Sequence, residues 1–362
     1  MAPGSAALVA TAAQVGYAAG IFLLAPLGDR LQHRPLVVAL LGLTGLGLLA
    51  AGAAPALPPL LCAGVLVGAT TVVAPILGAM AAGLVADDRR GAVSGTLLSG
   101  SIGGMLLSRA FGGALGEWLG WRAPYLAAAA LTLLVAATLA FALPETSPRS
   151  RQRYLTLLAG SLRLLRDEPD LRRSCFYQAA VFAGFSAVWT TVALLMTGPT
   201  YGLSARAVGT LALVGAGTML CAPLAGCLVD RRGPEPVSRA CMLGAVASAG
   251  ILLVGRLGGA AGLVALVSGT LLLDVAMQSG MIANQVRIYA LGQEVLSRLN
   301  TAYMTCAFLG GGLGSWLGTL AYGRLGWPGV CALVATLCAL ALARHRSHLR
   351  HAAFQAGLGD AG

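Results

Sequence analysis

The sequence predicts an all-α polytopic membrane protein whose helices form two pseudo-symmetric bundles. Of its 362 residues, 57% are hydrophobic and only 10% are charged. A soluble domain carries about 25% charged residues, so this composition favours a chain that crosses the membrane many times. Its 50 glycines fit the same class, because small residues let membrane helices approach one another closely.

Apolar runs long enough to cross a hydrocarbon core of about 30 Å recur along the whole chain. Lipid cannot hydrogen-bond to free backbone groups, so each run should be an α-helix. We therefore expect eleven transmembrane helices, at residues 6–26, 36–55, 58–85, 92–115, 123–143, 174–197, 206–229, 238–256, 261–284, 301–322 and 327–343.

The runs divide the chain into four parts. Residues 1–143 form an N-terminal bundle of five spans, and residues 174–343 form a C-terminal bundle of six. Between them, residues 144–173 make a basic cytoplasmic linker, and residues 344–362 make a cytoplasmic tail. The linker stretch "YLTLLAGSLRLLRD" mixes leucine and arginine and predicts an amphipathic helix on the inner membrane surface.

Basic residues alternate between the loops. All 24 of them are arginines; nineteen fall in one set of loops, four in the other, and Arg109 lies inside a span. The positive-inside rule places the richer set and the C-terminus in the cytoplasm, as in a bacterial inner or plasma membrane protein. The net charge of +11 does not indicate nucleic-acid binding, because the arginines form no continuous basic stripe on a solvated fold.

Two short motifs occur once in each half. "APLGDRLQHRPLV" and "GCLVDRRGPEPV" each end an apolar run with Asp-Arg, at Asp29 and at Asp230. "LGWR" and "LGWP" recur at almost the same spacing. These repeats indicate an internal duplication, and duplicated halves with a site between them are typical of transporters.

The stretch Gly226-x-x-x-Asp230-Arg231-Arg232-Gly233 resembles the cytoplasmic-loop signature of the major facilitator superfamily. "RLNTAYMTCAFLGGGLGSWLG" and "LGWR" are most similar to its bacterial drug, sugar and nucleoside efflux branch. The resemblance implies the twelve-helix, two-bundle fold, with the family's first helix missing here. It also implies proton-coupled efflux of a small organic molecule by alternating access.

The same resemblance implies a conformational latch at the two Asp-Arg loops. The alternative is that the arginines there only set topology. The N-terminal copy departs from the family pattern because Ala25 replaces a glycine. Gly64 stands where proton-linked members often carry arginine, and "GGMLLSRAFGG" lacks the proline of the antiporter signature. The expected latch residues are Asp29, Arg30, Arg34, Gly226, Asp230, Arg231, Arg232 and Gly233.

Polar side chains inside spans are costly in lipid and usually face a cavity. Asp274 and Arg109 are the only charged residues that we place well inside spans. We expect Asp274 to bind the coupling proton and Arg109 to act as its counter-charge or as an anchor for an anionic substrate group. A permanent buried pair, or two separately solvated residues, are the alternatives. The remaining expected pathway residues are Gln14, Tyr17, Gln178, Trp189, Gln278, Asn284 and Gln285. Gln178, Phe182, Phe185 and Trp189 are spaced i, i+4, i+7 and i+11, so we expect them to share one face of their helix.

Other function classes have little support in the sequence. No phosphate-binding loop or Ser/His/Asp set is present, so we expect neither an enzyme nor a cofactor. The eight cysteines fall in apolar runs without metal-ligand spacing. We expect a monomer whose partners are a small-molecule substrate, protons and membrane lipids. A truncated, transport-inactive paralogue or sensor is the alternative function.

Overall fold

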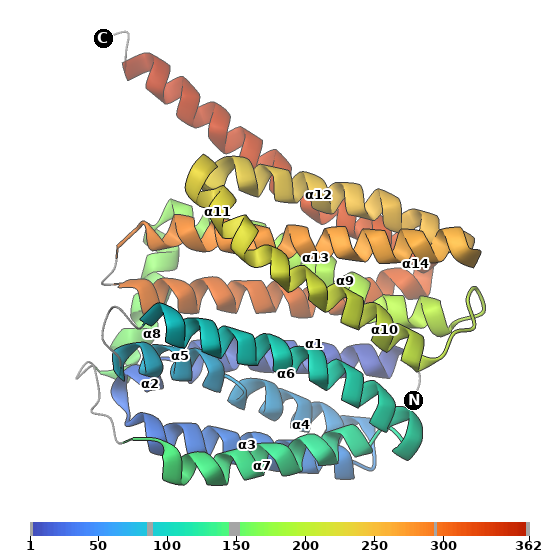
Figure 1. Ribbon diagram of the computed structural model, residues 1–362. Helices are drawn as coiled ribbons and strands as arrows, with labels where there is room; N and C mark the ends of the chain where they lie inside the picture. Colours follow the sequence, from blue (N-terminus) through green and yellow to red (C-terminus); the bar gives the residue numbers. More distant parts are fainter. Residues whose placement is uncertain (1–2, 85–89, 145–152, 293–294, 360–362) are drawn as a thin grey trace.

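The computed structural model describes residues 3–84, 90–144, 153–292 and 295–359, and they form a helical bundle (Figure 1). The first part of the chain supplies one group of helices. They are α1 (Pro3–Leu23), α2 (Leu27–Arg30), α3 (His33–Ala53), α4 (Leu57–Thr70), α5 (Val73–Leu84), α6 (Arg90–Leu119) and α7 (Ala123–Ala142).

The second part supplies the other group, with α8 between the two. These helices are α8 (Tyr154–Asp167), α9 (Pro169–Thr197), α10 (Ala205–Ala216), α11 (Ala222–Arg232), α12 (Pro234–Val254), α13 (Gly259–Tyr289) and α14 (Leu296–Gly359). Short 3₁₀ turns, η2 (Gly217–Cys221) and η3 (Gly255–Leu257), follow α10 and α12.

Every apolar run predicted from the sequence contains helix in the described residues, but two runs are broken. Residues 58–85 divide into α4 and α5, and residues 206–229 divide into α10, η2 and α11. Pro75 and Pro223 lie just after the two breaks. A proline ring clashes with the carbonyl four residues earlier and lacks an N–H, so a continuous helix fails there.

The structure supports a membrane protein, while the count of eleven crossings stays a prediction. Seven stretches of the described helices are long and apolar enough to cross a bilayer. The longest, Leu296–Arg350, contains Gly326 with a φ of 66°, which is non-helical. The chain reverses direction at this glycine, so α14 runs along the bundle and back again (Figure 1).

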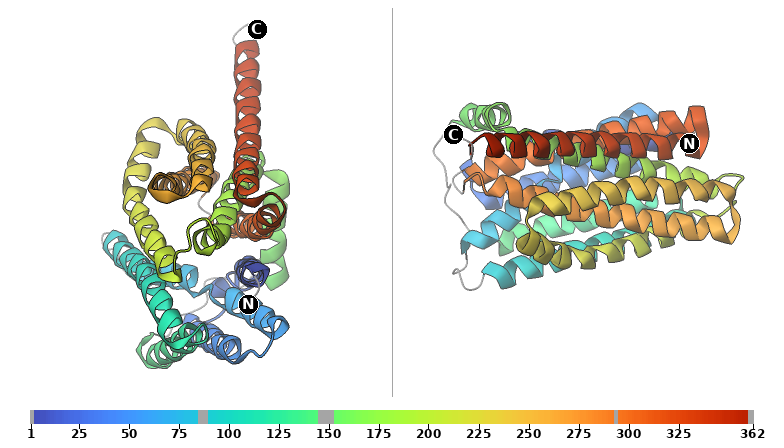
Figure 2. Two further views of the ribbon diagram at one scale, coloured as in Figure 1. Left: turned by 90° about the vertical axis from the view of Figure 1, so that its right-hand side faces the viewer. Right: turned by 90° about the horizontal axis from the view of Figure 1, so that it is seen from above.

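The two groups of helices lie side by side and meet along their length (Figure 2). Contacts of α1 with α14 and α9 make one part of the boundary, and contacts of α6 with α10 make the other. Because α1 belongs to the first group while α9 and α14 belong to the second, side chains on the sides of these helices that face each other lie where the groups join.

Helices α9 and α14 pack closely against each other in the second group. Gly310, Gly314 and Gly318 recur every four residues and face α9 at Ala179, Ala183 and Ala187. A Cβ atom at any of these glycines would lie 2.7 Å or less from an atom of the facing alanine. The backbones can approach this closely only because α14 presents no side chain there.

We predict that Gly314→Val destabilises the protein by about 1–3 kcal/mol, because its side chain must push α9 and α14 apart. Thermal unfolding in detergent should show a Tm lower by several degrees. Gly323→Val is the matched control on the same helix, since a Cβ there would meet nothing within 4 Å. Equal losses in both variants would contradict this account of the packing.

Candidate functional site

A buried carboxylate lies beside the boundary between the two groups. Asp274 on α13 is only 5% exposed. The indole Nε1 of Trp189 on α9 donates a hydrogen bond of 2.9 Å to Asp274 Oδ1. Gly215 of α10 covers the other carboxylate oxygen, because a Cβ there would lie 2.8 Å from Asp274 Oδ2. Trp189 therefore orients the carboxylate, and the backbone of α10 closes over it.

Aromatic rings connect this carboxylate to the first group of helices. Phe185 lies 6.2 Å from Trp189 and 5.6 Å from Phe182, measured between ring centroids. Phe182 lies 5.2 Å from Phe308 of α14, which in turn lies 4.4 Å from Tyr17 of α1. The aromatic face predicted for α9 is therefore continuous with Tyr17, which we expected to line the pathway. Together these rings present flat apolar surface at the boundary.

Neutral hydrogen bonds join the groups next to the aromatic row. Gln14 of α1 donates through Nε2 to Ser186 Oγ of α9 at 3.3 Å. Ser315 of α14 donates to Gln14 Oε1 at 3.5 Å and accepts from Thr190 Oγ1 at 3.0 Å. We call Gln14, Ser186, Thr190 and Ser315 the polar seam. Gln14, one of the expected pathway residues, thus contacts both α9 and α14.

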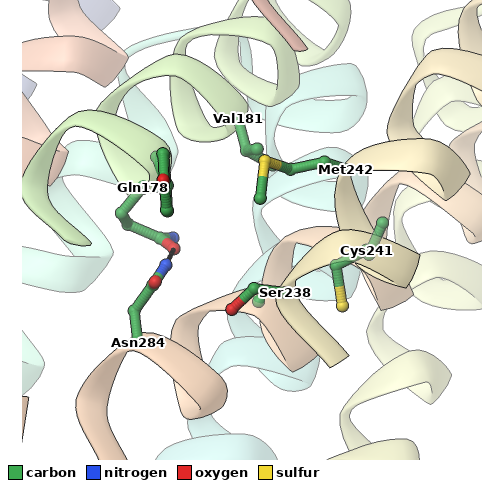
Figure 3. Close-up of a pocket in the computed structure, with 9 residues that line it drawn as sticks. Gln178, Val181, Ser238, Cys241, Met242 and Asn284 are labelled. Carbon is green, nitrogen blue, oxygen red and sulfur yellow. Dashed lines mark hydrogen bonds between the residues drawn. The ribbon is translucent and has the colours of Figure 1, made fainter. Parts of the chain in front are cut away.

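Gln178 shares the helical spacing of the aromatic row, but its side chain lies among polar residues of the second group. It is buried inside the second group, where Asn284 Nδ2 donates to Gln178 Oε1 at 3.4 Å (Figure 3). Both residues line a cavity of about 10 Å³, together with Ser238, Cys241 and Met242. This volume suits one water molecule, so Gln178 and Asn284 belong to the interior of the second group and not to its boundary.

An ionic network lies next to that cavity, and sequence reasoning missed it. Arg287 of α13 is 6% exposed and donates two hydrogen bonds to Glu235, at 3.1 Å from Nε and 3.3 Å from Nη2. Arg173 of α9 also donates to Glu235, at 2.7 Å. Arg287 further donates to Ser174, Ser238 and Asn284.

The sequence interpretation assigned Arg173 and Arg287 to solvated loops, whereas both are buried in helices. Helix α9 already begins at Pro169, inside the predicted linker. Fully buried His345 completes the network, with Nδ1 3.5 Å from Glu235 Oε2. The available signal was Glu235 itself, the carboxylate between Arg232 and Arg239 in the sequence. We call Arg173, Glu235, Arg287 and His345 the ionic network.

The remaining predicted residues have simpler surroundings. Gln278 and Gln285 are half-buried on α13. Helix α6 contains Arg109, but its side chain lies outside the described part of the structure, so the proposed pairing with Asp274 is not visible. In the described residues, no group of three or more His, Cys, Asp or Glu side chains could hold a metal ion.

The latch residues lie at two similar helix ends. Helix α2 ends at Arg30 just before α3 begins, and α11 ends at Arg232 just before α12 begins. Gly233 separates α11 from α12 with a φ of 79°, a conformation that favours glycine. The side chain of Asp29 lies outside the described structure. The other members are Arg30, Asp230, Arg231 and Arg232, which are exposed, and Arg34 and Gly226, which are half-buried.

Two groups of apolar helices that meet at buried polar side chains are typical of membrane transporters. The family model of the Major Facilitator Superfamily matches residues 1–285. The chain belongs to this superfamily, and it is a membrane protein of the transporter class.

Relatives and solved structures agree with this assignment. "Uncharacterized transporter YgaY" of Escherichia coli is 34% identical over 340 residues, which cover 93% of this chain and 84% of that protein. "Probable transporter SCO4007" of Streptomyces coelicolor is 36% identical over 335 residues, 91% of this chain and 76% of that protein.

Two solved structures share the fold. The nucleoside transporter NupG superimposes with a TM-score of 0.74 at 13% identity, over 95% of this chain and 90% of that chain. The human organic anion transporter MFSD10 superimposes with a TM-score of 0.66 at 20% identity, over 93% of this chain and 82% of that chain.

We predict that Glu235→Ala lowers the free energy of unfolding by about 3 kcal/mol, because it leaves two buried arginines without their shared carboxylate. Removing one partner of a buried ion pair usually costs about 3–5 kcal/mol. We expect the lower end of that range, since the Glu235 side chain is 31% exposed. Thermal unfolding measures the loss. Asp230→Ala is the control: it removes an exposed carboxylate near the same turn and should leave the Tm almost unchanged. Similar Tm values for the two variants would show that the ionic network contributes no stability.

Proposed function

We propose that the protein is a secondary active transporter that exports a small organic molecule in exchange for protons by alternating access. The observation that carries this proposal is the buried Asp274 carboxylate, bound by Trp189 beside the boundary between the groups. An ionised carboxylate is costly at membrane depth. A proton removes that cost, so occupancy by a proton and closure around Asp274 are coupled.

The aromatic row and the polar seam supply the surroundings that a flat or amphipathic solute would need. Binding pockets are mostly apolar with a few polar groups that fix orientation. Rings from Phe182, Phe185 and Phe308 offer the apolar part, and Gln14 offers an amide at the same boundary. Nucleosides and organic anions, the solutes named for the two solved relatives, should be screened first, followed by drugs and sugars.

We further propose that the two Asp-Arg loops act as a latch that breaks and re-forms as the groups rock. The exposed carboxylate of Asp230 lies near the end of α11, beside Arg231 and Arg232. Arginine alone would set topology, so a carboxylate in both copies supports a conformational role. We place the loops and the C-terminus in the cytoplasm of a bacterial cell, with the protein monomeric in the inner membrane.

We predict that Asp274→Asn abolishes pH-driven exchange but keeps solute binding, because asparagine cannot take up the proton. Proteoliposomes with an imposed pH gradient measure exchange, and a thermal-shift assay measures binding. Arg109→Ala should change solute binding less in the Asp274→Asn background than in wild type, if the arginine acts through the carboxylate.

Glu117→Gln is the matched control for this experiment, because it makes the same kind of change at an exposed carboxylate on α6. It should exchange like wild type. If Asp274→Asn transports with an unchanged pH profile, the proton role is wrong. A wild-type protein that binds a solute but never exchanges it would instead support the transport-inactive paralogue or sensor.

We predict that Asp230→Asn slows turnover by about fivefold or more, since it shifts a conformational equilibrium by an ordinary coupling energy. Solute binding and expression should stay near normal, because the residue is exposed and far along the chain from the aromatic row. Initial rates in proteoliposomes test this prediction. An unchanged turnover number would show that the Asp-Arg motif only sets the membrane topology.

A further inference from the structure

Helix α8 crosses the end of the bundle at which the C-terminus lies, and it runs across the other helices instead of along them (Figures 1 and 2). It contacts both groups. Tyr154 Oη donates a hydrogen bond of 2.5 Å to the carbonyl of Leu23, the last residue of α1. Farther along, Gly160 lies under Arg298 of α14, whose Cδ would be 3.0 Å from a Cβ at that glycine. One short helix thus joins the two groups at this end.

The two sides of α8 differ sharply in their surroundings. Leu157 and Ser161, one turn apart, are buried against the bundle. Leu155 and Leu162 face away from it and are 75% and 56% exposed. Ala159, which lies between them in sequence and on the same side of the helix, is also exposed. Exposed apolar side chains at i, i+4 and i+7 form a continuous apolar edge that no described part of the protein covers.

Basic side chains accompany this apolar edge. Arg163 and Arg166 are exposed on the same half of α8. Around the helix axis, Arg166 falls between Leu155 and Ala159. Arg163 follows Ala159 on the side away from the leucines. Asp167 is the one acidic residue of α8. Leucine beside arginine, on a helix at the end of a transmembrane bundle, is the pattern of helices that lie in the headgroup layer.

We propose that the exposed face of α8 is a binding site for anionic phospholipid. Arg163 and Arg166 bind the phosphate of the headgroup, while Leu155 and Leu162, with the small Ala159 between them, lie at the level of the upper acyl chains. A lipid is the occupant because the protein spans a bilayer, and because α8 crosses the helix bundle at its end, where a headgroup layer lies. Since α8 contacts α1 and α14, the bound lipid stabilises the arrangement of both groups at this end.

Purified full-length protein in a neutral detergent tests the site. Phosphatidylglycerol is titrated and its retention is measured by native mass spectrometry, with phosphatidylcholine as the uncharged reference lipid. Each arginine near an anionic surface contributes about fivefold to binding (about 1 kcal/mol). The double variant Arg163→Gln/Arg166→Gln should therefore bind phosphatidylglycerol about 25-fold more weakly, with phosphatidylcholine binding unchanged.

The matched control is Arg206→Gln/Arg256→Gln, which removes two exposed arginines next to the loops at the opposite end of the bundle. It should bind both lipids like wild type. Leu155→Ser/Leu162→Ser should weaken binding of both lipids, because it removes the two large side chains of the apolar edge. The proposal is overturned if the α8 arginine variant keeps its affinity for phosphatidylglycerol, or if both arginine variants lose it equally. It is also overturned if the protein retains soluble glycerol 3-phosphate as strongly as it retains phosphatidylglycerol.

Discussion

The structure depends on how closely α9 and α14 approach each other. Membrane helices gain no hydrophobic energy by leaving lipid for one another, so packing of small residues must hold them. Gly310, Gly314 and Gly318 provide that contact with α9. The same spacing that removes side chains from one face of α14 leaves Phe308 and Ser315 on the side toward α1. Part of the site is therefore built on two helices whose relative position is fixed by close backbone contact.

Much of this arrangement could be predicted from the sequence, because lipid imposes strong rules. Long apolar runs had to be helices, and each contains helix. Spacing along α9 placed Phe182, Phe185 and Trp189 together, and the rings do form one row. Asp274 was singled out because a charge inside a span needs a partner, and in the structure Trp189 donates a hydrogen bond to it.

The rest could not be predicted, because it depends on which helices become neighbours. Arg287 and Arg173 lie near the ends of apolar runs, where arginine usually meets water or headgroups. They are buried because Glu235, in the first turn of α12, lies between them, and a chain segment cannot reveal a neighbour far away in sequence. Gln178 shares the helical spacing of the aromatic row, yet it hydrogen-bonds to Asn284 inside the second group. Periodicity assigns a residue to a helix face but does not say what the edge of that face contacts.

The two polar clusters differ in strength, and the difference fits the proposed alternating-access mechanism, in which the two groups move relative to each other. Charged hydrogen bonds tie Arg287 and Arg173 to Glu235 within one group, and breaking such a network costs about 3–5 kcal/mol. Across the boundary, the hydrogen bonds of Gln14 to other described residues are neutral and measure 3.3 and 3.5 Å. Bonds of that kind contribute about 0.6 kcal/mol each between membrane helices. In the mechanism that we propose, the ionic network keeps the second group rigid, while the polar seam opens at a cost that binding of a solute or a proton supplies.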